Sequence, residues 1–257
     1  MSNIRQAFAR GKAFIGFLTG GDPSLERSEE FALEMARGGA DLVEIGIPFS
    51  DPIAEGAVIQ RANIRALSAG ATVEKIFALA RRVRQQTPVP LVFLTYLNPV
   101  FRYGYGAFFA RCAETGVDGI IIPDLPFEEQ AEARVAASAH GVEVISLVAP
   151  TSERRIQRIA SSAKGFLYVV SSLGVTGVRS EIKTDLAAIF ASARAASKIP
   201  VAVGFGINTP EQAAAIARIA DGVIVGSAIV RLIEEHGANA GKPVYEYVRK
   251  MKAAVSA

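Results

Sequence analysis

A single carboxylate stands inside an apolar segment of the sequence. Glu44 lies in segment 41–47 (DLVEIGI), and its immediate neighbours on both sides are apolar. If this segment is a strand of a parallel sheet, it is buried on both faces, and burial without a partner disfavours the ionised form of Glu44. Glu44 is therefore either one member of a structural ion pair or an acid–base group with a raised pKa. Its position favours the acid–base role.

Two more carboxylates follow in the next loop. Asp51 and Glu55 lie in segment 48–56, directly after the segment of Glu44. A reaction in which one group gives a proton while another takes one needs two separate carboxylates, and Glu44 with either loop residue would supply them. Each loop carboxylate could instead serve only as a loop or cap residue. The set predicts two-sided proton transfer.

A second set of residues is suited to binding a phosphate. Glycines recur in segments 171–177, 204–208 and 226–228, each at the end of a segment with strand character. Glycine lets backbone N–H groups approach an anion closely, and a helix that begins after the last segment would direct the positive end of its dipole toward it. One glycine could serve only a tight turn. Three such segments at neighbouring strand ends favour a phosphate site.

The positions of lysine and histidine weigh against two other chemistries. A Schiff-base enzyme needs a desolvated lysine at the carboxyl ends of the strands, but Lys164 and Lys198 precede strand segments and Lys183 lies far along a loop. A metal site needs clustered ligands. The two histidines, His140 and His236, lie before the fifth strand and beyond the eighth, and we expect both at the surface. We therefore expect no metal, and acid–base chemistry on a substrate that is its own electron sink.

The elements that must position these residues follow a regular order. Short apolar runs rich in β-branched residues alternate with longer amphipathic segments such as 25–37, 73–85 and 210–219, as in repeated βα units on a parallel sheet. Several of the amphipathic segments end just before a glycine, which is typical of a helix end. Others begin with a capping residue and a proline, as at 22–24 and 209–211. The predicted strands are eight: 13–19, 41–47, 91–96, 119–123, 143–149, 166–171, 201–206 and 222–226.

Eight βα units predict one closed (β/α)8 barrel, a TIM barrel, as a single domain over residues 1–257. Two small domains would also fit the length, but no linker or composition shift divides the chain. A doubly wound open sheet is the other alternative, and the first βα turn, segment 19–23 (TGGDP), lacks its glycine fingerprint. In a barrel, function is expected at the carboxyl ends of the strands.

Composition excludes other classes of protein. Half of the residues are apolar, the net charge is +3, and aromatic residues make up 8% with no tryptophan, so a basic, aromatic-rich nucleic-acid surface is not expected. No apolar run approaches the roughly 18 residues that span a membrane, and no signal peptide is apparent at the start. The expected location is the cytoplasm. The single cysteine, Cys112, is expected to be a small buried residue.

Four segments resemble the motifs of one known family. Segments 44–52 (EIGIPFSDP), 173–177 (LGVTG), 204–206 (GFG) and 226–230 (GSAIV) are similar to those of tryptophan synthase alpha subunits, and the similarity runs in order from Phe14 to Met251. The resemblance implies a TIM barrel that cleaves indole-3-glycerol phosphate into indole and glyceraldehyde 3-phosphate, with no cofactor in this chain.

The resemblance also implies roles for the two carboxylates. Glu44 would be the proton shuttle, which protonates indole C3 and takes the proton of the glycerol hydroxyl. Glu55 would take the indole N–H proton, at a position where the family usually has aspartate. Glutamate is longer by one methylene, which alters its reach toward the loop residue Thr176, and we expect the change to be tolerated.

The resemblance further implies which residues surround the substrate, although Leu147 could equally belong to the barrel core. The residues expected at the indole are Phe17, Leu94, Tyr96, Leu147, Tyr168 and Phe205, with Thr176 on a loop that closes over the substrate. Those expected at the phosphate are Gly177, Gly206, Gly226 and Ser227.

The partner that the resemblance implies is the tryptophan synthase beta subunit, which carries pyridoxal phosphate, in an alpha2beta2 complex. Phe101 is the clearest apolar candidate for this contact, because segment 98–103 is expected to be a loop after the third strand. It could equally fold back under that loop. The expected interface residues are Asp51, Pro52, Asn98, Phe101 and Pro126.

Three alternatives remain open at this stage. The first is another phosphate-binding barrel, such as an isomerase or a metal-dependent epimerase. The second is a stand-alone indole-3-glycerol phosphate lyase that works without a beta subunit. The third is a catalytically weak scaffold that activates a beta subunit, and Glu55 is the feature that invites it. Retention of both Glu44 and the glycine segments favours a working enzyme.

Overall fold

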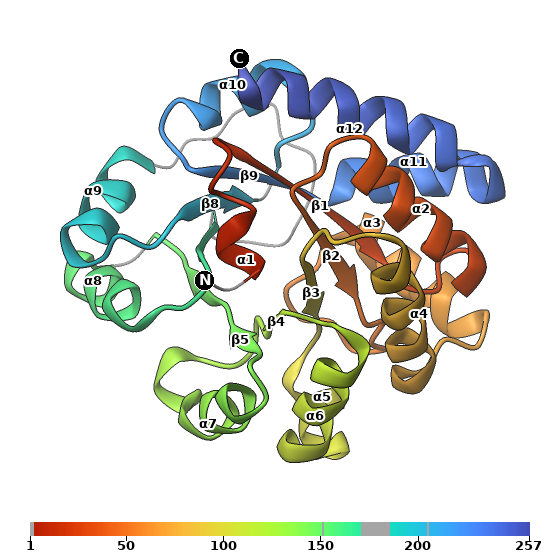
Figure 1. The fold of residues 1–257 in the computed structure, drawn as a ribbon, viewed down its shortest axis with the longest axis horizontal. Coiled ribbons are helices and arrows are strands. Elements are labelled where there is room, and N and C mark those ends of the chain that lie inside the picture. The colour runs from red at the N-terminus through yellow and green to blue at the C-terminus, as the bar shows by residue number, and fades with distance from the viewer. Residues whose placement is uncertain (1–2, 151, 171–185, 205) are drawn as a thin grey trace.

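The structure consists of parallel strands alternating with helices. The computed structural model describes residues 3–150, 152–170, 186–204 and 206–257. The strands are hydrogen-bonded in the order β5-β4-β3-β2-β1-β9-β8-β7-β6, and they curve into a nearly closed barrel with helices around it (Figure 1). The strands are β1 (Ala13–Thr19), β2 (Leu42–Gly46), β3 (Leu91–Leu94), β4 (Gly119–Ile121), β5 (Glu143–Val144), β6 (Ser146–Val148), β7 (Leu167–Val170), β8 (Val201–Gly204) and β9 (Gly222–Val225).

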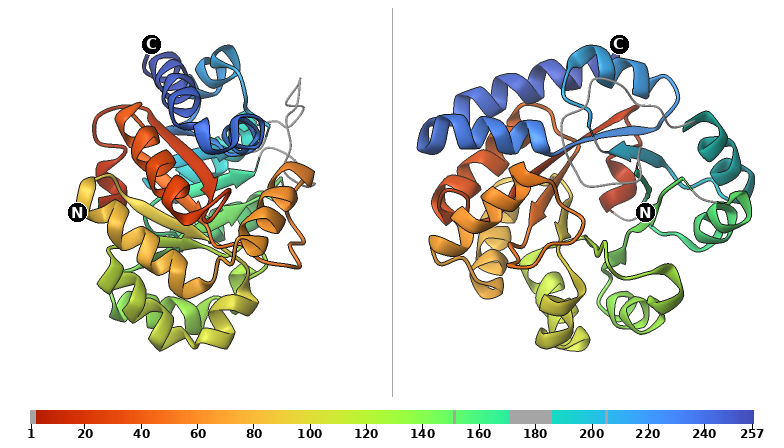
Figure 2. Two further views of the ribbon diagram at one scale, coloured as in Figure 1. Left: turned by 90° about the vertical axis from the view of Figure 1, so that its right-hand side faces the viewer. Right: turned by 180° about the vertical axis from the view of Figure 1, so that it is seen from behind.

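Apart from the short α1, the helices cover the outside of this barrel, which is seen from the side and from behind in Figure 2. The α-helices are α1 (Asn3–Gln6), α2 (Leu25–Arg37), α3 (Ala57–Ser68), α4 (Val73–Gln86), α5 (Leu97–Tyr103), α6 (Tyr105–Thr115), α7 (Ala131–Ala139), α8 (Glu153–Ser162), α9 (Leu186–Ala196), α10 (Pro210–Ala217), α11 (Ser227–His236) and α12 (Gly241–Ser256). The described residues also include two short 3-10 helices, η1 (Phe127–Glu129) and η2 (Gly237–Asn239). No helix among the described residues has the length and apolar character needed to cross a membrane.

The predicted TIM barrel is confirmed, with one difference in the strands. The described residues form nine strands instead of eight, because the fifth predicted strand is divided at Ile145. The first part pairs with β4 and the second with β7, so one run of chain supplies both ends of the strand order. The chain therefore joins the two ends of the sheet at Ile145.

Two local predictions were wrong. Helix α2 is capped by Ser24, which accepts a hydrogen bond from the N–H of Arg27, and Asp22 and Pro23 lie outside the helix. Segment 98–103 belongs to helix α5 and not to a loop. The prediction at 209–211 was right: Thr209 caps α10 through a capping box with Gln212.

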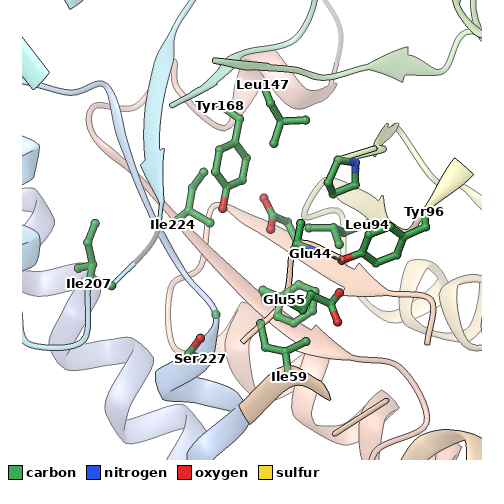
Figure 3. A pocket seen from close by; sticks show the side chains of 15 residues that line it. Glu44, Glu55, Ile59, Leu94, Tyr96, Leu147, Tyr168, Ile207, Ile224 and Ser227 are labelled. Carbon is green, nitrogen blue, oxygen red and sulfur yellow. Dashed lines mark hydrogen bonds between the residues drawn. The ribbon is translucent and has the colours of Figure 1, made fainter. Parts of the chain in front are cut away.

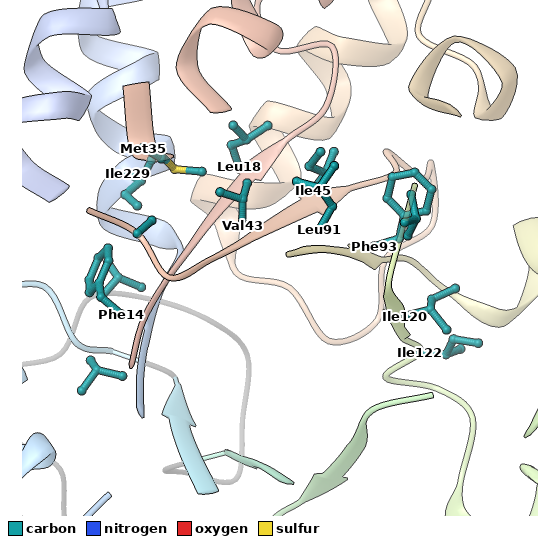
Figure 4. Packing of buried hydrophobic residues seen from close by; sticks show 14 of the residues in the cluster. Phe14, Leu18, Met35, Val43, Ile45, Leu91, Phe93, Ile120, Ile122 and Ile229 are labelled. Carbon is teal, nitrogen blue, oxygen red and sulfur yellow. The ribbon is translucent and has the colours of Figure 1, made fainter. Parts of the chain in front are cut away.

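The apolar core lies on both sides of the strands. Residues such as Leu18, Val43 and Ile45 are fully buried between the sheet and the helices (Figure 4). The inward side chains of alternate strand positions form a second cluster inside the barrel, which Ile4 of α1 joins. Figure 1 shows α1 lying across the barrel interior near the N-terminus. The described strands are thus buried on both faces, as the apolar runs predict.

Three aspartates form hydrogen bonds at the amino ends of strands. Asp41, Asp118 and Asp221 each follow a helix, and each accepts a hydrogen bond from the backbone N–H of a residue in a neighbouring strand, at 2.7, 2.9 and 3.0 Å. Each aspartate also forms a salt bridge with a lysine or arginine. These contacts tie the amino ends of the strands together, away from the pocket at their carboxyl ends.

Candidate active site

A pocket opens at the carboxyl ends of the strands. It holds about 730 Å³ of space, including the part open to solvent. Its wall is mostly apolar, and Figure 3 shows the two carboxylates, Glu44 and Glu55, among aromatic and aliphatic side chains. The lining residues are Phe17, Glu44, Ala54, Glu55, Ile59, Leu94, Tyr96, Pro123, Leu147, Tyr168, Gly206, Ile207, Ile224, Gly226 and Ser227.

Glu44 enters the pocket from the middle of strand β2. It pairs in register with Phe17 of β1 and Val92 of β3, and only 1% of it is exposed. Among the described residues, its Oε1 atom has no hydrogen-bond partner. Burial raises the pKa of Glu44 to about 8. The arrangement fits an acid–base group and not the structural ion pair.

Glu55 lies near Glu44 but in a different environment. It is 7% exposed, and its Oε2 accepts a hydrogen bond of 2.6 Å from the side-chain amide of Asn63 on helix α3. Burial raises the pKa of Glu55 to about 7, while the hydrogen bond from Asn63 opposes that rise. The Glu55 backbone carbonyl accepts a second bond, 2.7 Å, from Gln60. The helix that follows Glu55 in the chain therefore holds both its backbone and its carboxylate.

Asn63 was not identified from the sequence. It lies on the buried face of α3, which also carries Ile59, Ala62 and Ala66. A polar side chain on the buried face of a helix needs a hydrogen-bond partner, and this requirement could have marked Asn63 as a candidate from the sequence. The partner itself depends on how the loop before α3 is folded. Apolar lining residues such as Ile207 and Ile224 were also not predicted from the sequence, and Ile224 lies near Tyr168 in Figure 3.

Two tyrosines shape the pocket around the carboxylates. The hydroxyl end of Tyr168 lies toward Glu44 in Figure 3. Its pKa is raised well above the ordinary value, mainly because the hydroxyl is buried and to a smaller extent because of the charge of Glu44. Gly204 makes room for this ring, because a Cβ atom at that position would lie 2.3 Å from the Tyr168 hydroxyl oxygen. On the other side, the Tyr96 hydroxyl accepts a hydrogen bond of 3.0 Å from the backbone N–H of Ala54. This contact fixes the loop that carries Glu55.

Part of the pocket wall has backbone suited to an anion. Gly206, with φ of +88°, follows β8, and Gly226 and Ser227 lie at the N-terminus of the ten-residue helix α11. Free N–H groups and the helix dipole favour a negative group at such a point. The other predicted members of the substrate site, Thr176, Gly177 and Phe205, lie outside the described residues. The predicted members that are described, Phe17, Leu94, Tyr96, Leu147, Tyr168, Gly206, Gly226 and Ser227, all line this one pocket.

The predicted partner residues lie at the surface. Phe101 is 65% exposed on helix α5 and packs edge to face with Tyr105, with ring centroids 6.3 Å apart, so it is not folded underneath. Asp51, Asn98 and Pro126 are also exposed, and Pro52 is half-buried.

The groups that other chemistries would need are elsewhere. His140 and His236 are exposed, as are Lys164 and Lys198, and the Lys164 ammonium contacts Ser138. Among the described residues no group of three or more His, Cys, Asp or Glu could hold a metal ion. Cys112 is buried in α6, as predicted.

The fold and the site define a TIM-barrel enzyme with two buried carboxylates in an apolar pocket. Residues 4–256 match the family model described as tryptophan synthase alpha chain. The chain is 47% identical to the tryptophan synthase alpha chain of Lacticaseibacillus casei over 257 residues, with 100% of this chain and 97% of that protein covered. It is 49% identical to that of Lactiplantibacillus plantarum over 256 residues, covering 99% and 97%.

Solved structures agree with this assignment. The crystal structure of tryptophan synthase subunit alpha from Legionella pneumophila superposes with a TM-score of 0.90 at 37% identity, covering 99% of this chain and 98% of that one. The chain belongs to the tryptophan synthase alpha chain family. It is therefore a carbon–carbon lyase of tryptophan biosynthesis.

Proposed function

We propose that Glu44 and Glu55 carry out the reaction of this family, the cleavage of indole-3-glycerol phosphate into indole and glyceraldehyde 3-phosphate. One observation carries the proposal. Two buried carboxylates line the same apolar pocket, and their pKa values are raised to different extents, to about 8 and about 7. At a pH between these values Glu44 keeps its proton while Glu55 is ionised. One group can then give a proton while the other takes one.

The proton transfers follow from these two states. The protonated Glu44 gives its proton to indole C3, and Glu55 takes the proton of the indole N–H, which leaves a carbon–nitrogen double bond in the ring. The ionised Glu44 then takes the proton of the hydroxyl on the adjacent glycerol carbon. That carbon becomes the aldehyde as its bond to C3 breaks, the electron pair returns to the ring, and Glu55 gives the proton back to nitrogen. The protonated Glu44 and the ionised Glu55 are restored.

The apolar side chains and the glycines of the pocket bind different parts of the substrate. Phe17, Leu94, Tyr168 and Ile224 offer an apolar surface for the flat indole ring. The phosphate is assigned to Gly206, Gly226 and Ser227, together with Gly177. Thr176 and Phe205 keep the substrate-binding roles that the family resemblance implies.

The partner in this proposal is the tryptophan synthase beta subunit, with pyridoxal phosphate bound in that subunit, in an alpha2beta2 complex. A chain in the crystal structure of the tryptophan synthase complex from Pyrococcus furiosus aligns with 95% of this chain at 34% identity. We assign Asp51, Pro52, Asn98, Phe101 and Pro126 to the contact surface. The exposed phenyl ring of Phe101 is its apolar centre. We also propose that residues 1–257 act as one domain in the cytoplasm.

Indole release from indole-3-glycerol phosphate tests the proposal. The purified chain is assayed alone and with a beta subunit, beside Glu44→Gln, whose fold is checked by circular dichroism. Release that the partner accelerates and that Glu44→Gln abolishes supports the alpha-subunit function. Release without any partner effect indicates a stand-alone lyase. No release by the folded wild-type chain overturns the catalytic proposal.

The scaffold alternative rests on Glu55 and is tested at that residue. If the longer side chain had made the chain a weak enzyme, Glu55→Asp would greatly raise cleavage by the isolated chain. In the structure the Glu55 carboxylate already reaches Asn63 at 2.6 Å, so a shorter side chain loses that contact. We therefore expect Glu55→Asp to leave cleavage unchanged or lower.

A further inference from the structure

An ion-pair network lies beside the pocket and joins three elements. The guanidinium of Arg65, on helix α3, binds the Asp22 carboxylate through Nε and Nη2, both at 2.8 Å. Its Nη1 donates to Glu234 of helix α11 at 2.9 Å. Asp22 lies in the loop after strand β1 and is only 1% exposed. Arg65 therefore connects α3 to a buried loop on one side and to α11 on the other.

Two of the elements joined by Arg65 carry groups that line the pocket or hold a lining residue in place. Helix α3 carries Asn63, two residues before Arg65, and Asn63 holds the Glu55 carboxylate. Helix α11 begins at Ser227, which also lines the pocket. The loop after β1 is itself held, because Ser28 accepts from the N–H of Gly21 at 2.9 Å. The position of α3 relative to these elements sets where Glu55 stands.

We propose that Arg65 is a positioning residue for the cleavage reaction: it fixes helix α3 against the loop after β1 and against α11, and so holds Asn63 and Glu55 in place. The inference rests on the proposed role of Glu55. The structure favours arginine here because its planar fork makes two parallel bonds to the Asp22 carboxylate while a third N–H reaches Glu234. Lysine carries the same charge but has no such fork.

The same helix supplies a matched control. Arg61 also binds Glu234 through two bonds, at 2.6 and 2.8 Å, but it does not reach Asp22 and is more exposed than Arg65. Arg61→Lys therefore changes an arginine that binds the same carboxylate without touching the loop after β1. Arg65→Lys keeps a positive charge beside the buried Asp22, which an uncharged replacement would leave unpaired at a large cost in stability.

The experiment measures kcat and KM for indole-3-glycerol phosphate well below the unfolding temperature. We expect Arg65→Lys to lower kcat by about tenfold to a hundredfold, since a displacement of about 1 Å at a catalytic group can have an effect of that size. KM should change by less than about twofold, because α11 also packs against β1 and α12 and keeps Ser227 in place. Arg61→Lys should leave both constants near the wild-type values. Equal kcat in Arg65→Lys and wild type, with only a lower unfolding temperature, overturns the proposal.

A double variant tests whether Arg65 acts through Asn63. If it does, Arg65→Lys should lower kcat by less than about twofold when it is made in an Asn63→Ala chain, because the contact that it positions is already gone. Full additivity of the two losses contradicts the inference. Failure of the underlying function has a different signature, since the wild-type chain itself would then release no indole.

Discussion

The side-chain amide of Asn63 lies 2.6 Å from the Glu55 carboxylate. The Oε1 atom of Glu44, in the same pocket, has no hydrogen-bond partner within the part of the chain that the structure describes. Burial raises the pKa of both carboxyls, but the bond from Asn63 stabilises the ionised form of Glu55 alone. One hydrogen bond thus helps to keep Glu55 the stronger acid of the two, and so the group that is ionised first as the pH rises.

The order of these two pKa values, which are those of the free chain, predicts a narrow pH optimum for kcat/KM. The rate should rise as Glu55 loses its proton near pH 7 and fall as Glu44 loses its proton near pH 8. Indole release measured from about pH 5 to pH 10 should therefore give a bell-shaped profile with its maximum between these values. A rate that stays flat across this range would show that these carboxyls do not control the reaction.

Removing the Asn63 amide should move the rising side of that profile. In Asn63→Ala the ionised Glu55 loses its hydrogen bond, so its pKa rises further and the rising limb shifts to higher pH. A shift of one pH unit lowers the rate on that limb about tenfold. Gln60→Ala is the matched control, since Gln60 bonds the Glu55 backbone and not its carboxylate. An unmoved limb in Asn63→Ala contradicts the assignment.

Glu44 should make the folded state less stable as the pH rises. Its pKa is raised from 4.5 to about 8 on folding, so the folded state holds a proton that the unfolded state has released between these values. Its contribution is fully present below the unfolded pKa and is lost as the pH rises through about 8. Relative to Glu44→Gln, the wild type should lose about 1.4 kcal/mol of unfolding free energy per pH unit in that range. Urea unfolding at successive pH values measures it, and parallel curves for the two proteins would refute it.

A methyl group at Gly204 should disturb the substrate pocket. Because the added Cβ would lie 2.3 Å from the Tyr168 hydroxyl oxygen, Gly204→Ala must displace a ring that faces Glu44. We expect kcat/KM to fall at least about tenfold, as for a misplacement near a reacting group. Gly106→Ala, where nothing lies within 4 Å, should leave activity unchanged. Wild-type kinetics in Gly204→Ala would mean that the Tyr168 ring can move without consequence.

An acidic side chain at Phe101 should weaken the response to the beta subunit. Phe101→Asp replaces an exposed apolar ring on α5 by a charge, and a central apolar contact of this kind contributes about 2 kcal/mol or more to association. Stimulation by the beta subunit should then need a roughly 30-fold higher partner concentration, since 1.4 kcal/mol is a factor of ten. Val135→Asp is the control, because Val135 is 74% exposed on helix α7 and outside the proposed surface. Equal titration curves for both variants would remove Phe101 from the interface.

Much of the fold could be predicted from local patterns in the sequence. The apolar runs have the length of strands and the segments between them have helical spacing, so the order of elements follows from where side chains can be buried. Strand β1 and helix α2 have the predicted bounds. Glu44 was identifiable because a carboxylate inside a strand that is buried on both faces is costly and therefore stands out.

The contacts between elements were decided by the tertiary structure. Asn63 with Glu55, Arg65 with Asp22, and Gly204 with Tyr168 each join residues from different strands, helices or loops. Local periodicity determines which face of an element is buried, but it does not determine the rotation and height at which two elements meet. A hydrogen bond depends on atomic positions to within a few tenths of an ångström. The partners of the buried polar groups, which adjust the chemistry of the pocket, are therefore a consequence of packing.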